Sequence, residues 1–130
     1  AKPANPTFGE TFVWPDGLAV KVGSLTEFTP DEWAVGTVEG QASVFFDVTI
    51  TNNTDETVES VMILVTAVSG GREASHIFDS ANGIDMPTAS ILPGESLTWT
   101  EAFSVVDPNH VRVNVDNVID FQRDSVNFTN

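Results

Sequence analysis

The oxygen-bearing side chains of the segment DSANGID are the first candidates for chemistry in this chain. Asp79, Asn82 and Asp85 surround a glycine, and carboxylate and carboxamide oxygens are the ligands that Ca²⁺ prefers. An EF-hand-type loop places its ligands at about every second position and ends with a distal Glu, whereas the ligands here are three residues apart. The segment is therefore a candidate calcium site, but its spacing favours a solvated loop.

A second candidate is the aromatic residue that ends the segment TPDEW. Trp33 follows Asp31 and Glu32 in a predicted loop, and an exposed Trp with polar neighbours is typical of ligand sites such as those for sugars. The other tryptophans, Trp14 and Trp99, fall on strand faces that are predicted to point inward, which assigns them to the core. Trp33 could bind a ligand or cover one end of the domain, and the second interpretation is the simpler one.

The two histidines of the chain, His76 and His110, offer little for catalysis. Neither belongs to a nucleophile or metal motif, since neither G-x-S-x-G nor H-E-x-x-H is present. A general base at either position would also need a carboxylate and a nucleophile that the fold brings together. We therefore expect two surface histidines, no enzyme and no cofactor.

The composition excludes several classes of partner. The chain has 19 acidic residues against 5 basic ones, and its net charge of −14 repels nucleic acid and disfavours anionic membranes. Cysteine is absent, which excludes disulfides and thiolate metal sites. No apolar run approaches the roughly 18 residues of a membrane-spanning helix, so no transmembrane segment is expected.

The elements that must position these residues are predicted by alternation of period two. In residues 44–51 the even-numbered residues are apolar and share an inward face, while the odd-numbered ones, from Phe45 to Thr51, point outward. Residues 58–68 are apolar on both faces, which predicts one strand that is covered on both sides or central in its sheet. The intervening NNTDET has the Asn and Asp residues typical of a tight reversal.

Other segments follow the same pattern. Glu101 lies on the inward face of one predicted strand, which requires either a bulge that redirects it or a position at the rim. Thr29 and Pro30 predict one helical turn at most, which Gly36 would end. Further strands are predicted at 18–22, 95–106, 110–118 and 125–128, together with a short first strand at 12–14 and a weaker strand at 72–78.

Together these elements predict an all-β fold. About seven to nine short strands separated by Gly, Pro and Asn turns are typical of an immunoglobulin-like antiparallel β-sandwich in two sheets. The 130 residues correspond to a single domain, which we assign to residues 8–130, and residues 1–7 look like the remnant of a linker.

The order of these features also resembles a known family. The segments that carry the likeness are Gly9-Glu10, VTITNNT at 48–54, LPGES at 92–96 and Phe103-Ser104-Val105. They are similar to segments of the immunoglobulin-like domains of exported Gram-positive, notably actinobacterial, proteins, the DUF4352-type or MPT63-like (telokin-like) group. The resemblance covers nearly the whole chain from residue 8 onward. It implies a secreted or lipid-anchored domain without established catalysis. Members usually carry a small or apolar residue where this chain has Glu101.

Two functions follow as expectations. The first is a non-enzymatic interaction or spacer module of an exported protein or lipoprotein, outside the cell, with a cell-envelope component or a protein as its partner. A lipid anchor upstream and a monomeric state go with it. The alternative is a small-ligand module for carbohydrate or calcium that uses loop residues such as Trp33 or Asp79.

Overall fold

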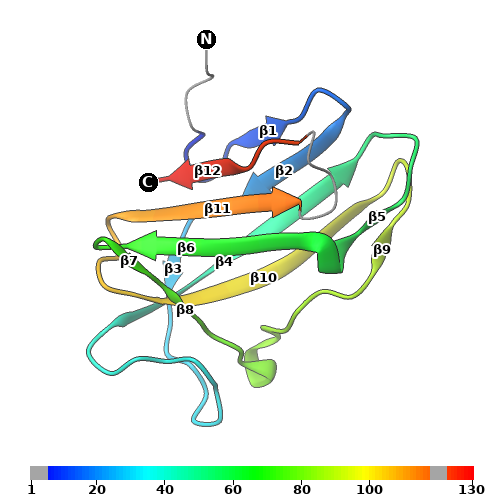
Figure 1. Ribbon diagram of the computed structural model, residues 1–130. Helices are drawn as coiled ribbons and strands as arrows, with labels where there is room; N and C mark the ends of the chain where they lie inside the picture. Colours follow the sequence, from blue (N-terminus) through cyan, green and yellow to red (C-terminus); the bar gives the residue numbers. More distant parts are fainter. Residues whose placement is uncertain (1–5, 118–122) are drawn as a thin grey trace.

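The computed structural model describes residues 6–117 and 123–130 (Figure 1). No helix in these two ranges has the length and the apolar character needed to cross a membrane. In chain order the elements are β1 (Thr11–Val13), β2 (Leu18–Val22), β3 (Thr26–Glu27), β4 (Ala42–Asn52), β5 (Val58–Glu59), the 3₁₀-helix η1 (Ser60–Met62), β6 (Ile63–Ser69), β7 (Arg72–Glu73), β8 (Ser75–His76), the 3₁₀-helix η2 (Ser80–Asn82), β9 (Ser90–Ile91), β10 (Ser96–Val105), β11 (Val111–Asn117) and β12 (Val126–Thr129).

Two antiparallel sheets pack face to face. One has the strand order β1-β2-β4-β10-β8, with β3 also paired to β4, and the other has the order β12-β11-β6-β7, while β5 and β9 form a separate pair. Figure 1 shows β6 and β11 in a layer over β4 and β10. Among the described residues, seven strands have three residues or more. The predicted immunoglobulin-like sandwich is confirmed.

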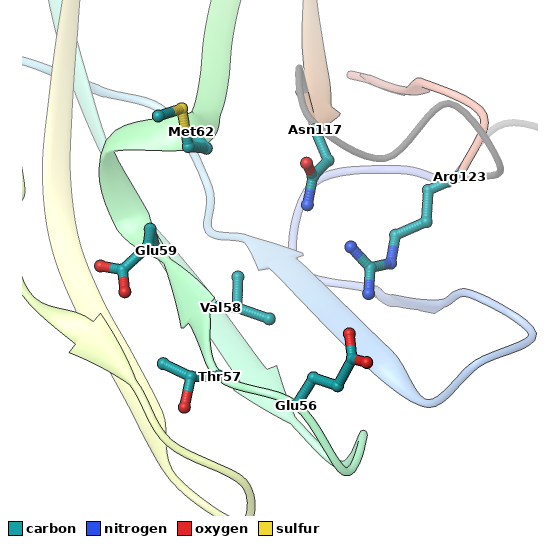
Figure 2. Close-up of a pocket in the computed structure, with 7 residues that line it drawn as sticks. All are labelled: Glu56, Thr57, Val58, Glu59, Met62, Asn117 and Arg123. Atoms are coloured by element: carbon teal, nitrogen blue, oxygen red, sulfur yellow. The ribbon is translucent and has the colours of Figure 1, made fainter.

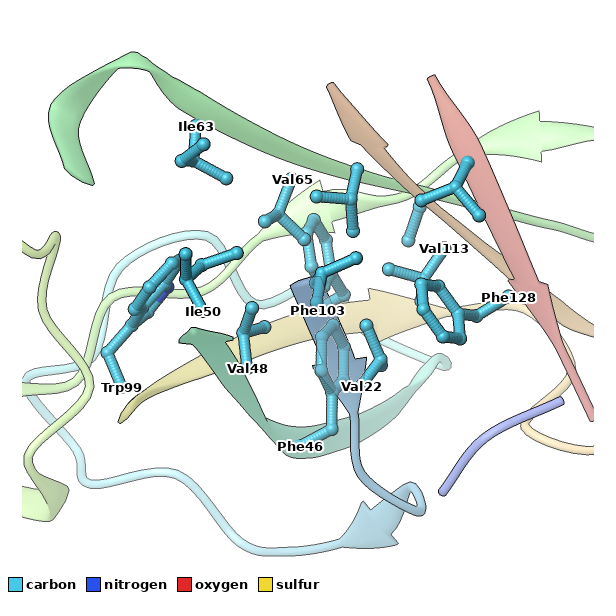
Figure 3. Close-up of a cluster of buried hydrophobic side chains, with 14 of the residues drawn as sticks. Val22, Phe46, Val48, Ile50, Ile63, Val65, Trp99, Phe103, Val113 and Phe128 are labelled. Atoms are coloured by element: carbon cyan, nitrogen blue, oxygen red, sulfur yellow. The ribbon is translucent and has the colours of Figure 1, made fainter. Parts of the chain in front are cut away.

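The core lies between the two sheets (Figure 3). All even-numbered residues from Val44 to Ile50 are buried, as the alternation predicts. Phe46 of β4 stacks on Phe103 of β10 with ring centroids 5.9 Å apart. The predicted core positions of Trp14 and Trp99 are confirmed. Burial of this kind contributes about 25 cal/mol for each Å² of apolar surface removed from water, so the inward faces hold the sheets together.

The position of Glu101 is decided by the register of β10. This strand pairs with β4 without interruption from Ser96 to Val105, so no bulge redirects the carboxylate. Glu101 remains on the inward face and is buried. On its other side, within the described part of the chain, β10 pairs with the two-residue strand β8, at Phe103 and Ser104. Glu101 therefore lies at the rim of the core, close to the edge of the sheet.

The expectation of one strand over residues 58–68 was wrong, although its larger part, β6, is flanked by β11 and β7 as expected for a strand that is central in its sheet. The segment is divided into β5, η1 and β6, because Ser60 N–H donates to the Ala89 carbonyl (3.2 Å) and β5 pairs with β9 instead of extending β6. The inward residues of β6 are buried, but Val61 and Leu64 are 47% and 50% exposed. The outer side of this segment is thus not covered.

Two further segments connect the sheets. Residues 72–78 were expected to form one strand, but β7 pairs with β6 in one sheet and β8 pairs with β10 in the other. The reversal after β4 also leads from one sheet toward the other. The buried Asn52 closes it, since its Nδ2 donates to the carbonyls of Glu56 and Ile91 (2.8 Å each) and its Oδ1 accepts from Thr54 N–H (3.0 Å).

The segment TPDEW forms a turn and no helix. Asp31 organises it: its Oδ2 accepts from Trp33 N–H (3.1 Å), and its carbonyl accepts from Ala34 N–H (3.0 Å). Aspartate competes with helix formation in this way because its short side chain bonds nearby backbone groups.

The start of the domain lies beside its last strand. Thr129 N–H donates to the Pro6 carbonyl and Phe8 N–H donates to the Thr129 carbonyl, both at 3.1 Å. Pro6 therefore already contacts the sandwich, and the boundary expected at residue 8 stays a prediction.

Candidate functional site

Two loops meet at one end of the sandwich. We call residues 28–41, between β3 and β4, the Trp33 loop, and residues 77–89, between β8 and β9, the Asp79 loop. Val35 and Phe78 exchange two backbone hydrogen bonds, of 2.9 and 2.8 Å, which join the loops directly. The pairing brings together the two sets of candidate residues that the sequence separates by about 50 positions. We call the pair of loops the two-loop site.

Asp79 ties the two loops together. Its side chain is buried, and Oδ2 accepts from Asn82 Nδ2 (2.7 Å) and from Asp31 N–H (2.9 Å). The hydrogen bond from Asn82, followed by that from the backbone of Asp31, lowers the pKa of the Asp79 carboxyl below its ordinary value. Asp79 and Ile84 also exchange backbone hydrogen bonds of 3.0 and 2.9 Å, which close the loop.

The arrangement of the calcium candidates follows from these bonds. Asp79 Oδ2 is already occupied by two N–H donors, Asn82 lies beside it, and Asp85 is exposed beyond the closed loop. In the described ranges no three carboxylate or imidazole side chains converge in a way that would hold a metal ion. The calcium site therefore stays a prediction with little geometric support.

Trp33 is presented to solvent by a loop that is held at several points. Its side chain is 83% exposed, so it does not cover the end of the domain. Ser75 Oγ donates to the Gly36 carbonyl (2.7 Å), next to the backbone pair made by Val35. Val35 is 66% exposed and Glu32 is exposed. The loop therefore presents the exposed apolar side chains of Trp33 and Val35, with the acidic Glu32 beside them, on a backbone that hydrogen bonds hold in place.

Gly36 shows how closely the Trp33 loop approaches β8. Its φ is +100°, and a Cβ at this position would lie 1.9 Å from the backbone oxygen of His76. Only glycine fits such a contact, because any other residue would both clash and adopt a disfavoured backbone conformation.

A small second apolar cluster lies beneath the two loops, on the outer face of the six-stranded sheet. Phe28 and Phe45 meet edge to face with ring centroids 5.4 Å apart, next to the buried Ile77, Ile84 and Ala102. A pocket of about 250 Å³ opens beside the two rings. It is lined by Phe28, Thr29, Phe45, Asn82, Ile84 and Thr100.

Sequence reasoning missed this pocket. The available signal was Phe45, an aromatic residue on the face that otherwise carries Asp47, Thr49 and Thr51. A large apolar side chain in an exposed row indicates that something covers it. Here the two loops cover Phe45, and the sequence around Phe45 does not predict that these loops approach the sheet.

The rim of the core holds a polar network next to the site. Glu101 Oε2 accepts from Trp99 Nε1 (2.7 Å), and Glu101 Oε1 is hydrogen-bonded to His76 Nε2. The imidazole stacks on Phe103 and Phe78 with centroids 4.4 and 4.9 Å apart. The expectation that His76 is a plain surface histidine is therefore wrong, since its ring is packed and bonded.

This network positions the Asp79 loop. His76 ends β8 and is followed directly by the residues that join the two loops. The other histidine, His110, is exposed as expected and faces Asp107 across 3.9 Å. The described histidines thus perform packing and surface roles in this arrangement.

A separate pocket of about 300 Å³ lies near β5 and η1 (Figure 2). Two of its charged groups are held by other residues: Arg123 Nε donates to Asp16 Oδ2 (2.8 Å), and Glu59 Oε2 accepts from Ser90 Oγ (2.7 Å). The hydrogen bond from Arg123 lowers the pKa of the Asp16 carboxyl. These contacts give the pocket a structural role in joining chain segments.

Comparison with known proteins identifies the fold and leaves the family open. No protein-family model matches the chain, and no curated protein matches it. The yjhA protein of Bacillus subtilis matches with a TM-score of 0.76 and 12% identity, over 95% of this chain and 98% of that one. The secreted protein MPT63 of Mycobacterium tuberculosis matches with a TM-score of 0.66 and 18% identity, over 99% and 97%.

A third similar structure belongs to a longer protein. It is ycdA of Bacillus subtilis, a candidate lipoprotein, with a TM-score of 0.71 and 18% identity over 88% of this chain. Our chain spans only 36% of the length of that protein. At such identities the likeness shows that these chains share a β-sandwich fold.

Proposed function

We propose that this chain is a non-enzymatic binding module of an exported protein, and that its two-loop site attaches it to a component of the cell envelope. The observation that carries the proposal is Trp33, 83% exposed on a loop that Asp79 and Val35 hold in place. Exposed tryptophans on fixed backbones are typical anchors of interfaces, where they bury much surface at small entropic cost. A simple spacer would not need such a residue.

A location outside the cell is supported by the likeness to proteins described as secreted or as a candidate lipoprotein. A lipid anchor upstream and a monomeric state belong to the same proposal. The net charge of −14 favours a neutral or basic partner, because a polyanion would be repelled.

The non-enzymatic role is supported by how the titratable groups are used. Asp79 accepts hydrogen bonds that hold loops, and Glu101 bonds His76 and Trp99 at the rim of the core. Each group acts as a structural acceptor, and none of these contacts places a nucleophile beside a base.

Binding to purified cell envelopes tests the proposal. We expect Trp33→Ala to weaken cosedimentation of the domain with envelopes of its source cells about tenfold or more, as loss of an interface anchor does. Leu64→Ala is the matched control, because Leu64 is 50% exposed on β6 in the other sheet. Equal binding by the wild-type domain and the Trp33 variant would contradict the proposal.

A further inference from the structure

The pocket beneath the two loops has the form of a small preformed binding site. Its floor is the outer face of β4 and β10, with Phe45 and Thr100, and its sides come from Phe28 of the Trp33 loop and Ile84 of the Asp79 loop. Asp79 joins the two sides through its bonds to both loops. Because these walls are fixed before any ligand arrives, binding would cost little ordering entropy.

The polar atoms around the pocket offer unused hydrogen-bonding capacity. Thr29 Oγ1 has no hydrogen-bond partner within residues 6–117 and 123–130. Asn82 uses Nδ2 to reach Asp79, which leaves its Oδ1 as an acceptor. Thr100 Oγ1 donates to Asp47 Oδ1 (2.8 Å), so its lone pairs remain available. A ligand with several hydroxyl donors would satisfy these atoms.

The lining carries no charge. None of the residues that line the pocket is acidic or basic, although the whole chain has a net charge of −14. An ion would lose hydration in the pocket without gaining a lining residue of opposite charge, which is costly. Its volume of ≈ 250 Å³ is below the ~300–1,000 Å³ that is usual for drug-sized ligands, so it has room for one ring-sized unit.

We propose that this pocket binds one neutral saccharide unit. The C–H groups of the sugar would contact both Phe28 and Phe45, and because the two aromatic rings are perpendicular the sugar ring would stack on the π-face of one of them, which carries partial negative charge. The sugar hydroxyls would donate to Asn82 Oδ1 and Thr100 Oγ1 and exchange a hydrogen bond with Thr29. The inference rests on the proposed binding function and gives the two-loop site a ligand class, namely the neutral glycans of a cell envelope.

Chemical-shift titration of the whole chain tests the assignment. The probes are methyl glucoside, methyl galactoside and N-acetylglucosamine up to ~50 mM, since a ligand this small is expected to bind in the millimolar range. We expect saturable shifts of the amides of Thr29, Asn82 and Thr100 with at least one probe. Glucuronate, which is anionic, should shift them at least several times less.

Two variants show whether the shifts report the pocket. Thr100→Val keeps the shape of the side chain but removes the acceptor, and we expect it to weaken sugar binding several-fold. Thr98→Val is the control, because Thr98 lies on the same face of β10 and bonds Thr49 (2.9 Å) outside the pocket. Equal weakening by both variants would overturn the assignment.

The absence of saturable shifts with all three sugars would also overturn it. N-acetyl-leucinamide tests the main competitor, an apolar side chain of a protein partner. If this probe alone shifts the pocket amides, the saccharide assignment is wrong. A failure of the saccharide assignment can be told apart from a failure of the proposed envelope binding, because Trp33→Ala changes the envelope anchor and leaves the residues that line the pocket in place. If the pocket binds a sugar but Trp33→Ala attaches to envelopes as well as the wild type does, Trp33 is not the anchor and the saccharide assignment stands. If Trp33→Ala no longer attaches to envelopes but no sugar shifts the pocket amides, the envelope-binding proposal stands and only the saccharide assignment is wrong.

Discussion

Asp79 shows how one buried carboxylate can organise a surface site. Its side chain receives hydrogen bonds from the backbone of one loop and from the side chain of the other, 2.9 and 2.7 Å long. A carboxylate that accepts several N–H donors is stabilised in its charged form. Asp79, a candidate metal ligand in the sequence, therefore acts as a hydrogen-bond acceptor that holds the two loops together.

The lowered pKa of Asp79 predicts a specific acid sensitivity. Because the folded-state pKa lies below the unfolded value of about 3.9, the charged side chain stabilises the fold above that pH, and this contribution is lost as pH falls through the folded pKa. We expect Asp79→Asn to lower Tm at pH 7, and the gap from the wild type to shrink below about pH 4. Thermal melts from neutral to acid pH measure it.

The control for this prediction is Asp85→Asn, which removes an equal charge from an exposed side chain of the same loop. It should leave Tm close to that of the wild type at neutral pH. A Tm gap for the Asp79 variant that stays constant down to the lowest pH would show that its charge does not stabilise the fold.

Glu101 is the other residue whose environment decides its role. A buried carboxylate among apolar residues would be costly without partners, but Trp99 and His76 provide them. The contact with His76 also holds the short edge strand β8 against β10, which pair at two positions, Phe103 with His76 and Ser104 with Ser75. A side chain that breaks the apolar pattern thus helps to place the Asp79 loop.

At the scale of elements, the site depends on long loops laid against a rigid sheet. The Trp33 loop has little regular structure of its own, and its order comes from contacts with Phe78, Asp79 and Ser75. Loops of this length in compact domains are uncommon and usually carry function. The sandwich supplies the fixed frame from which Trp33 is presented.

Substitution of Gly36 should release this loop. Gly36→Ala places a Cβ 1.9 Å from the His76 oxygen at a φ of +100°, so we expect the loop to detach from β8 locally. Amide hydrogen exchange of Val35 and Phe78, which bond each other, should accelerate at least about tenfold, because local opening replaces a closed contact.

Gly40→Ala is the matched control for this substitution. Gly40 has a φ of +83°, yet a Cβ there would meet nothing within 4 Å. It should cost about 1–2 kcal/mol of backbone strain at most and leave the exchange of Val35 and Phe78 nearly unchanged. Equal acceleration in the two variants would mean that the close contact at Gly36 does not hold the loop.

At the scale of the whole molecule, charge is the dominant property. The 19 acidic and 5 basic residues are dispersed along the chain, and no group of carboxylates in the described ranges forms a metal site. Such a charge keeps a protein soluble and repels other polyanions. It also destabilises the compact state slightly through self-repulsion, which salt relieves.

Melting in different salts separates diffuse charge from a calcium site. We expect ~1 mM calcium and sodium chloride of matched ionic strength to raise Tm by the same small amount over EDTA, since diffuse repulsion is screened according to the ionic strength, whichever salt supplies it. A specific site would instead stabilise by RT ln(1 + [L]/Kd), about 2.7 kcal/mol at 100 times Kd. A saturating shift with calcium alone would restore the site at Asp79, Asn82 and Asp85.

The sequence by itself determined the strand faces and thereby the fold class. Side chains alternate across a strand with period two, so the apolar residues at every second position from Val44 to Ile50 and from Val111 to Val115 had to share one face, and a chain with many such runs closes into a sandwich. The core positions of Trp14 and Trp99 followed from the same periodicity. These predictions succeed because they depend only on neighbours in the chain.

Only the tertiary structure decided how the apolar segments are divided among strands and sheets, and where a candidate site forms. Residues 58–68 are divided because β5 pairs with the distant β9, and a local pattern carries no information about that partner. Asp31 and Asp79 meet across 48 positions of sequence, and Phe45 becomes a pocket wall only when two loops cover it. Each of these features depends on contacts between groups far apart in the chain: the backbone pairing of β5 with β9, the hydrogen bond from Asp31 N–H to the Asp79 carboxylate, and the packing of two loops over Phe45.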